Sequence, residues 1–537
     1  MPVTVNANTA LAIFEHAFQA YPNRPAFTCL GTTLTYRQID EQSAALSAYL
    51  ANELKLVPGD RIALQMPNIT QYPIALYAAL RAGLVIVNVN PLYTPRELRH
   101  QLKDSGAKAL IVLANVAAEV AQVVEQTPVE HVIVTEIADF MPWPKRLLVN
   151  LAVKYIKKMV PDFFFAKPVA LLDAIKKGQG LAAPQVDVKP EDLMILQYTG
   201  GTTGVAKAAM LSQFNLYSNV QQIKTHFPEF FSDESEIFGA PLPLYHIYAL
   251  NLHLLSGFSN GAHSILIPNP RDLPSLFDAL SAHKMTVFVG INTLFNAMLN
   301  HKRFDELDFS KLKVTAAGGM ALTSETARKW EERTKSKISE GYGLTETSPV
   351  VTTNKVSAVQ LGSIGTPLVD TEVKVIDEQG DTLPAGEAGE LCIRGPQVMQ
   401  GYWRKPDATK EVLDDEGWFR SGDIALIQPD GYLKIVDRKK DMIIVSGFNV
   451  YPNEVEDVAM THPAILEAAV VGVPSSDGCE QVKIFVVTQD ESLSEEDVIA
   501  HCRENLTRYK VPKLVEFRKE LPKSNVGKIL RRELRDQ

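Results

Sequence analysis

Cysteine is scarce in this 537-residue chain, and its few cysteines do not form a recognisable site. The spacing includes no CxxC pair and fits neither a zinc ribbon nor a disulfide-rich secreted scaffold. We therefore expect reduced thiols that pack as small buried hydrophobic side chains, without a catalytic-cysteine motif. The four cysteines are Cys29, Cys392, Cys479 and Cys502.

Long apolar runs and an excess of positive charge are also missing. No uncharged apolar run approaches the roughly 18–20 residues that cross a bilayer. No Lys or Arg precedes Arg24, and Glu15 interrupts the first apolar stretch, which argues against a signal peptide. With 54 Lys+Arg against 63 Asp+Glu, the net charge of −9 offers no basic footprint for nucleic acid. We expect a cytoplasmic globular protein of two or three packed units.

Helical and strand patterns alternate along the first two thirds of the chain. Such strand–helix–strand order is typical of parallel sheets with helices on both faces, and it predicts an α/β fold. Helical spacing covers residues 9–21, 36–54, 71–82 and 117–126, with Thr35 as a cap, and strand-length apolar runs cover 61–65, 84–89, 109–113 and 131–134.

The pattern changes beyond Pro367. Short strands with turn signals, at 372–376, 389–394 and 431–437, predict a β-rich subdomain over about 367–436. The charged run 437–441 indicates a linker or hinge, after which a small α+β domain follows. The alternative is a solvated turn within one domain.

A basic amphipathic stretch occupies residues 140–160. Between Lys145 and Lys158 it holds five basic and no acidic residues, interleaved with apolar ones and flanked by Trp143 and Phe163–Phe165. Such a helix suits an anionic membrane surface. The alternative is a surface helix packed on its own domain.

A glycine- and threonine-rich loop follows an apolar strand and precedes a helical pattern. Glycines let backbone N–H groups approach phosphate oxygens, hydroxyls add donors, and a lysine supplies counter-charge. The loop differs from a Walker-type loop because its lysine lies three residues after the last glycine. A surface turn could share this composition, but we predict a phosphate site made by Thr199, Gly200, Gly201, Thr202, Thr203, Gly204 and Lys207.

The segment 340–347 places an aromatic ring, a hydroxyl and a carboxylate close together. Tyr342, between Gly341 and Gly343, could stack on a purine; Thr345 could bond a phosphate. Glu346 could hold Mg²⁺, because one carboxylate plus substrate phosphates is a usual ligand set. Alone the segment is equally typical of a turn.

Three further charged residues stand at turns or strand ends. A carboxylate such as Asp423 can accept the hydroxyls of a ribose, with Arg438 as a second charged group. Lys528 follows a glycine in a segment, 508–535, that has ten basic and three acidic residues. This segment suggests a polyanion-binding surface; each feature alone is also typical of solvated surface.

Taken together, these motifs resemble those of adenylate-forming enzymes, the superfamily of acyl-CoA synthetases, luciferases and peptide-synthetase adenylation domains. The resemblance spans nearly the whole chain, with motifs in the same order. The sequence segments 241–246, 291–296, 437–450 and 521–532 resemble those of bacterial long-chain fatty-acid–CoA ligases. The motifs are 198–209, 241–249, 340–347, 418–424, 436–445 and 522–531.

The resemblance implies a role for each motif in binding ATP. The loop 199–207 would hold the phosphates, and Tyr342 would pack on adenine. Thr345 would contact the α-phosphate, and Glu346 would bind Mg²⁺. Asp423 would bond the ribose hydroxyls, with Arg438 near the same sugar.

The resemblance also implies the acyl and CoA contacts. His246 would stand beside the acyl carboxylate, and Lys528 would reach the carboxylate and the bridging oxygen. Lys440 matches the position of the hinge residue in the family. The hinge would join a body of residues 1–439 to a mobile domain of residues 440–537. Gly447 would line the pantetheine channel after rotation. Where many relatives have glycine, this chain has Ala208, for which we expect a helical conformation without loss of activity.

The implied reaction uses ATP to convert a medium- or long-chain fatty acid to acyl-AMP, then transfers the acyl group to CoA. It would serve β-oxidation or lipid synthesis, in an enzyme whose relatives are often dimers. Alternatives are transfer of the acyl group to a carrier protein, activation of an aryl or short-chain acid, or a non-catalytic nucleotide-binding or membrane-adaptor role. A serine hydrolase is also conceivable because residues 257–261 read GFSNG, although that elbow needs a preceding strand and a following helix.

Overall fold

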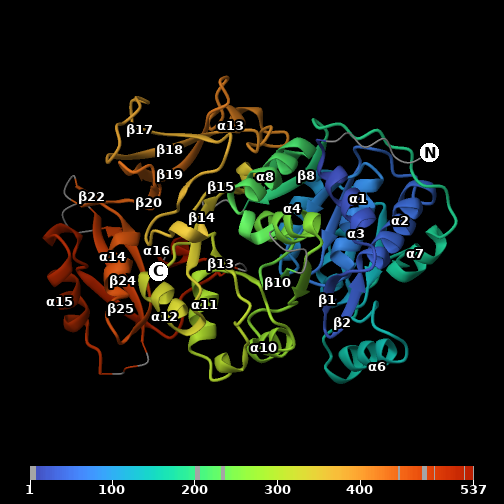
Figure 1. Cartoon of the computed structure of the whole chain (residues 1–537), viewed down its shortest axis with the longest axis horizontal. Helices are drawn as coiled ribbons and strands as arrows, with labels where there is room; N and C mark the ends of the chain where they lie inside the picture. Colours follow the sequence, from blue (N-terminus) through green and yellow to red (C-terminus); the bar gives the residue numbers. More distant parts are fainter. Residues whose placement is uncertain are drawn as a thin grey trace.

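Two mainly parallel sheets with flanking helices form the body of the molecule (Figure 1), which confirms the predicted α/β class. The computed structural model describes residues 8–199, 206–231, 236–445, 448–474, 480–488, 490, 492–524 and 527–535. Within them no helix is long and apolar enough to cross a membrane.

The first sheet has the strand order β7-β6-β5-β3-β4-β8-β9, and its neighbours are parallel except for the β8–β9 pair. Its strands are continuous apolar runs because both faces are covered by helices. The strands are β3 (Arg61–Gln65), β4 (Val85–Asn88), β5 (Ala109–Leu113), β6 (His131–Thr135), β7 (Val169–Ala170), β8 (Leu193–Thr199) and β9 (Lys207–Ser212).

The second sheet has the order β16-β15-β14-β13-β12-β10-β11-β1-β2. Its parallel part is β1, β11, β10, β12, β13 and β14; β2 is antiparallel at one edge, and β15 and β16 are antiparallel at the other. The strands are β1 (Pro25–Cys29), β2 (Thr32–Thr35), β10 (Ile237–Ala240), β11 (His263–Leu266), β12 (Val287–Gly290), β13 (Val314–Ala317), β14 (Ile338–Gly343), β15 (Val350–Thr353) and β16 (Thr366–Pro367).

Helix capping explains where the first helices begin. The Thr9 hydroxyl accepts a bond from the N–H of Ala12, and Thr35 forms a reciprocal capping box with Gln38. The body's helices are α1 (Ala10–Ala20), α2 (Tyr36–Asn52), α3 (Gln71–Arg81), α4 (Pro95–Ser105), α5 (Ala117–Ala121), α6 (Lys145–Leu151), α7 (Leu171–Gly178), α8 (Gln213–His226), α9 (Ile247–Ala249), α10 (Leu273–Ser281), α11 (Asn292–Leu299) and α12 (Ser324–Thr334).

Beyond Pro367 the predicted β-rich region is present as an antiparallel sheet, β17-β18-β19-β20. Its elements are β17 (Glu372–Ile376), β18 (Ala388–Arg394), α13 (Pro406–Lys410), β19 (Phe419–Ile427) and β20 (Leu433–Arg438).

The C-terminal elements pack around a hydrophobic cluster of their own, which contains Val455, Ile484 and Val498. A hairpin, β21 (Ile443–Val445) with β22 (Phe448–Val450), precedes the sheet β23-β24-β25. The remaining elements are α14 (Pro452–Ala459), β23 (Ile465–Pro474), β24 (Glu480–Thr488), α15 (Glu495–Asn505), β25 (Leu514–Arg518) and α16 (Arg531–Arg535). They lie at one end of the molecule, beside β20 (Figure 1).

Two expectations about local structure are wrong. Ala208 lies in strand β9, paired with Tyr198, and not in a helix; the helix begins only at Gln213. Extended backbone suits alanine, so the position needs no glycine. The helix expected over 117–126 is split into α5 and a separate 3₁₀ turn, η2 (Val124–Gln126).

Candidate active site

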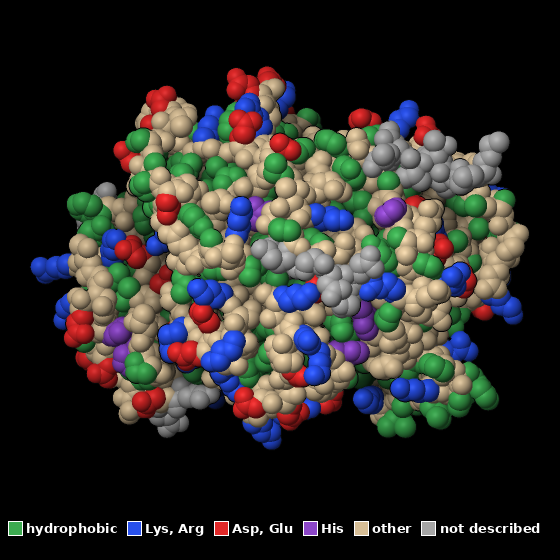
Figure 2. Space-filling model, viewed as in Figure 1, with side chains coloured by type: hydrophobic (Ala, Val, Ile, Leu, Met, Phe, Trp, Pro, Cys, Tyr) green, Lys and Arg blue, Asp and Glu red, His purple; other side chains and the backbone are tan. Residues whose placement is uncertain are grey.

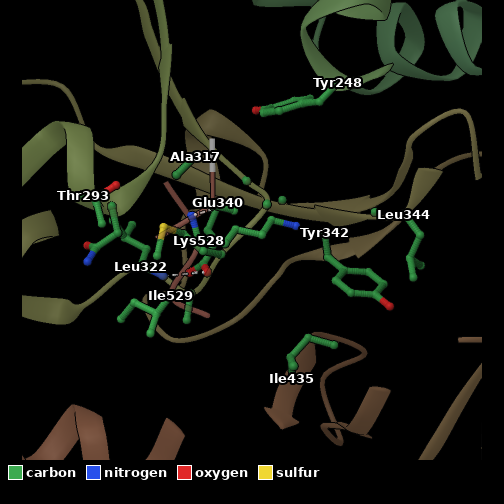
Figure 3. Close-up of a pocket in the computed structure, with 18 of the residues that line it drawn as sticks. Tyr248, Thr293, Ala317, Leu322, Glu340, Tyr342, Leu344, Ile435, Lys528 and Ile529 are labelled. Atoms are coloured by element: carbon green, nitrogen blue, oxygen red, sulfur yellow. Dashed lines mark hydrogen bonds between the residues drawn. The ribbon is translucent and has the colours of Figure 1, made fainter. Parts of the chain in front are cut away.

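A cleft of about 1740 Å³ lies between the body and the C-terminal elements, and both contribute to its walls. The body provides the ends of β13 and β14 and the segment after β10. The C-terminal part provides the residues around Lys528 (Figure 3). Open α/β sheets commonly bind ligands beyond the carboxyl ends of their strands, as here.

The end of β14 fixes the position of Tyr342. Gly343 must lack a side chain, because a Cβ there would lie 1.9 Å from the carbonyl oxygen of Pro349. A Cβ on Gly341 would lie 3.1 Å from the Thr352 carbonyl oxygen, another tight approach. The two predicted glycines therefore let β14 pair closely with β15 and present Tyr342 to the cleft.

Tyr342 and Asp423 are in direct contact. The tyrosine hydroxyl donates to Asp423 Oδ2 at 2.6 Å, and Arg438 Nε lies 3.7 Å from Asp423 Oδ1. Strands β19 and β20 hold Asp423 and Arg438 close together, because the two residues are paired across the β-ladder. Burial raises the pKa of Asp423, while Arg438 and Tyr342 oppose that shift. The arrangement offers an aromatic ring beside a carboxylate.

The turn η8 (Thr345–Thr347) directly follows and brings a second carboxylate into the cleft. Glu346 Oε1 accepts a hydrogen bond from the hydroxyl of Tyr402 at 2.8 Å. Burial raises the pKa of Glu346, and Lys207 opposes this shift. Thr345 lines the same cleft, so its hydroxyl and the Glu346 carboxylate are available to one ligand.

Tyr402 also connects Glu346 with the predicted phosphate loop. Lys207 Nζ lies 5.1 Å from the centre of the Tyr402 ring, a cation–π distance. Thr199 and Lys207 are opposite each other in the β8–β9 ladder, and the Thr199 hydroxyl donates to the Lys207 carbonyl at 3.3 Å. The strands thus hold both ends of the loop together. Gly200, Gly201, Thr202, Thr203 and Gly204 lie outside the described residues.

His246 stands at the start of α9 on the opposite wall. Its Nδ1 accepts the N–H of Tyr248 at 3.4 Å, so Nε2 carries the hydrogen of the neutral ring. Burial, together with the charge of Lys528, lowers the pKa of His246 to about 4. The imidazole is therefore neutral at pH 7 and can donate one hydrogen bond.

Apolar side chains also line the cleft. The chain continues from α9 into a buried π-helix, η5 (Leu250–Gly257), whose Leu252 lines the cleft. Ile223 of α8, Phe227 directly after α8 and Val350 of β15 line it as well. π-Helical turns are frequent at functional sites. These side chains suit an apolar ligand portion better than a charged one.

Lys528 enters the cleft from the C-terminal part, between Glu340 and Tyr342 (Figure 3). Burial and the charge of Arg438 lower its pKa to about 8, while Asp423 and Glu346 oppose the shift. Gly527 has a φ of +80°, which favours glycine, and a Cβ there would lie 2.6 Å from Ile291 Cδ1. The loop therefore needs a glycine next to the lysine to dock on the body.

Lys440 also lines the cleft, two residues after the end of β20. It lies in the short connection between β20, which pairs with β19, and the hairpin β21–β22. A hinge is expected at this connection. Asp437 contacts the C-terminal part by accepting the Asn453 N–H at 2.8 Å. Gly447 is outside the described residues.

Sequence reasoning missed Tyr402, Glu340 and Arg271. Tyr402 lies in a Gly-Tyr-Trp sequence that matches no recognised binding motif. Only the folded structure shows its contact with Glu346. Glu340 Oε1 accepts the Leu322 N–H at 3.1 Å, and burial raises its pKa to about 8. Arg271 donates to the Ser524 carbonyl, a contact between distant segments.

Other catalytic sites considered from the sequence have little structural support. Ser259 lies in a 3₁₀ turn, η6 (Phe258–Asn260), with the π-helix before it and strand β11 after it, which is not a nucleophile elbow. Cys29, Cys392 and Cys502 are free and buried, and burial raises their pKa values. Cys479 lies outside the described residues, among which no His, Cys, Asp or Glu side chains form a group of three suited to a metal ion.

Comparison with known proteins shows the family of the chain. Residues 14–403 match the family described as AMP-binding enzyme, and residues 454–528 match the AMP-binding enzyme C-terminal domain. The chain therefore belongs to the AMP-binding enzymes, the class that the motifs predicted.

Its relatives identify a narrower group within that class. The chain is 50% identical over 541 residues to a long-chain-fatty-acid–CoA ligase of Salmonella typhimurium, covering 100% of this chain and 96% of that protein. The Haemophilus influenzae protein of the same name is 49% identical, covering 99% and 95%. A crystal structure of the anthranilate CoA ligase AuaEII in complex with anthranoyl-AMP has a TM-score of 0.88 at 25% identity, covering 100% of this chain and 98% of that one.

Proposed function

We propose that this protein is a long-chain fatty-acid–CoA ligase. It uses ATP to convert a medium- or long-chain fatty acid to acyl-AMP with release of pyrophosphate, then transfers the acyl group to CoA with release of AMP. The observation that carries the proposal is the convergence of Lys528, from the C-terminal part, with Thr345, Glu346, Asp423 and His246 in one cleft.

The first step requires activation of a poor acyl donor. A carboxylate cannot expel oxide, so one of its oxygens attacks the α-phosphorus of ATP in line with the departing pyrophosphate. The protein's contribution is positioning and charge neutralisation. Tyr342 would pack on adenine, Asp423 would accept the ribose hydroxyls, and Arg438 would flank the same sugar.

The acid and the phosphates meet between Lys528 and His246. The neutral His246 would donate through Nε2 to one carboxylate oxygen, leaving the other free to attack. The Lys528 ammonium would contact the carboxylate and the bridging oxygen as negative charge develops there. Thr345 would bond the α-phosphate, while the loop 199–207, with Thr199 and Lys207 at its ends, would hold the remaining phosphates.

The chemistry of Glu346 fits Mg²⁺. Magnesium is usually held by one or two carboxylates plus substrate phosphates, and Glu346 lines the cleft beside Thr345. When bound, the ion would neutralise charge on the phosphate oxygens. The Tyr402 hydroxyl on Oε1 would hold the carboxylate in position.

The second step needs a different arrangement. The CoA thiolate attacks the acyl carbon of acyl-AMP, the thioester bond forms, and AMP leaves with the electron pair of the broken C–O bond. We propose that the part beyond residue 439 rotates about Lys440, withdrawing Lys528 and bringing Gly447 to the pantetheine channel. Residues 1–439 would then be the adenylating body and residues 440–537 the mobile domain.

The direct experiment measures AMP and acyl-CoA formation across C4 to C18 acids with ATP, Mg²⁺ and CoA. Activity that rises toward long chains supports the proposal, because the apolar side chains of Ile223, Phe227, Leu252 and Val350 line the cleft. Preference for an aryl or short-chain acid would contradict it. Acyl-AMP that forms but is taken only by a carrier protein would make the protein a fatty acyl-AMP ligase.

The proposal includes a cellular setting. We propose a cytoplasmic enzyme of fatty-acid metabolism, serving β-oxidation or lipid synthesis, that makes peripheral contact with the inner membrane surface, where its acid substrate partitions. The resemblance to dimeric relatives suggests association of two copies, which sedimentation velocity tests.

A further inference from the structure

A segment outside the lining of the cleft has no role in the chemistry proposed above. Helix α6 continues into a π-helical turn, η3 (Ala152–Ile156), and neither contains a buried residue. The pair projects from the lower edge of the body, away from the C-terminal elements (Figure 1). We name residues 143–164 the projecting segment.

Large apolar side chains are concentrated on the projecting segment. Eight of the eighteen exposed large hydrophobic side chains of the described residues lie within it. Ile156 is 80% exposed, Phe164 78% and Trp143 74%. The others are Leu147, Leu148, Leu151, Tyr155 and Met159. Single exposed hydrophobic residues are ordinary, but a contiguous group marks an interaction site.

Positive charge accompanies these apolar side chains. Lys145, Arg146, Lys154, Lys157 and Lys158 lie in the segment, and no acidic residue stands between Lys145 and Lys158. Figure 2 shows blue and green side chains together on this lobe at the lower right. Two of these cations have acidic neighbours, since Arg146 interacts with Asp139 and Lys157 with Asp272. The excess is nevertheless positive on a chain whose net charge is −9.

The segment is held in place at its base. Asn150 accepts the Ala138 N–H at 3.0 Å and donates to Glu136 Oε2 at 2.8 Å. Asn115 donates to the Met159 carbonyl at 2.9 Å, and Phe165 is buried in the body's core. The apolar side chains are thus displayed by a supported structure.

We propose that the projecting segment docks the enzyme on an anionic lipid bilayer, with its apolar side chains in the headgroup region and its lysines among the phosphates. Basic residues with aromatic and aliphatic neighbours have this interfacial chemistry. The inference deepens the proposed function, whose substrate partitions into bilayers. A second copy of the chain is a poorer occupant, because a two-fold contact would face one basic segment with another.

The test is flotation of the full-length protein with phosphatidylcholine vesicles and with vesicles that also contain phosphatidylglycerol. The protein should bind the anionic vesicles and bind less as salt increases. L148D/I156D should lower the partition coefficient at least about tenfold, because it places charge among the apolar contacts. Each lysine neutralised in K154Q/K158Q should lower it by about fivefold, from about 1 kcal/mol per charge. V57D, at a 56% exposed valine elsewhere, should bind as the wild type does.

Three results would overturn the docking proposal. They are absence of wild-type binding to anionic vesicles, unchanged binding of both double variants, and a loss of dimer in L148D/I156D, which would make a second copy the occupant. Activity on water-dissolved hexanoate separates this proposal from the enzymatic one. If the variants keep that activity and lose only turnover of vesicle-bound oleate, both proposals are supported. If the wild type turns over none of the acids but still binds anionic vesicles, the enzymatic proposal fails and the docking proposal does not.

Discussion

Arg271 Nη2 donates a hydrogen bond to the carbonyl oxygen of Ser524 at 3.2 Å, joining the body to the loop that carries Lys528. Within that loop the Ser524 N–H donates to the Lys528 carbonyl at 2.7 Å, and Ser524 Oγ accepts the Lys528 N–H at 3.1 Å. Arg271 therefore contacts the turn that positions Lys528.

Arg271→Ala should slow acyl-AMP formation about threefold to tenfold, because it removes one hydrogen bond worth about 0.5–1.5 kcal/mol from the adenylating arrangement. The measurement is pyrophosphate release, compared with acyl-CoA formation from supplied acyl-AMP. The second rate should not fall, and Arg271→Lys should recover part of the first. Equal loss of both rates would indicate a general structural defect.

Tyr402→Phe should raise the Mg²⁺ concentration needed for half-maximal adenylation severalfold. The change removes the hydroxyl that donates to Glu346 Oε1 and leaves a buried carboxylate with one partner fewer. Tyr432→Phe is a matched control, because its hydroxyl also bonds one acceptor, the Ala358 carbonyl, but outside the cleft. An unchanged Mg²⁺ dependence in Tyr402→Phe would contradict the placement of the ion at Glu346.

Much of the site could be predicted from the sequence because its residues lie in short local motifs. Tyr342, Thr345 and Glu346 fall within five positions, and the glycines around Tyr342 are explained by the close pairing of β14 with β15. The cap at Thr35, which begins α2, was likewise predictable. Features of this kind depend on residues that are neighbours in the sequence, so one sequence is enough to predict them.

What escaped prediction depends on contacts between distant segments. Tyr402 and Glu346 are 56 positions apart, and Arg271 and Ser524 are 253 apart. The helical conformation expected at Ala208 is wrong because ladder pairing with β8, a tertiary contact, sets an extended backbone there. Tertiary contacts set these features, and one sequence does not display them.

Adenylation should fall as pH rises through about 8. Burial and Arg438 lower the pKa of Lys528 to about 8, so its ammonium is protonated below that pH and neutral above it. The measurement is kcat/KM for ATP in pyrophosphate release from pH 6 to 9.5, because this ratio reports the free enzyme. Lys528→Arg, which stays charged, should retain a lower activity without that alkaline decline; a decline shared by both proteins would assign it to another group.

The central claim is that Lys528 serves the first half-reaction and leaves the cleft for the second. Lys528→Ala is the direct test, with circular dichroism to show that the variant is folded. Acyl-AMP formation, followed by pyrophosphate release, should be abolished, because no other described lysine replaces this ammonium beside His246, while acyl-CoA formation from supplied acyl-AMP should largely persist. Equal loss of both half-reactions in the folded variant would contradict the two-arrangement mechanism.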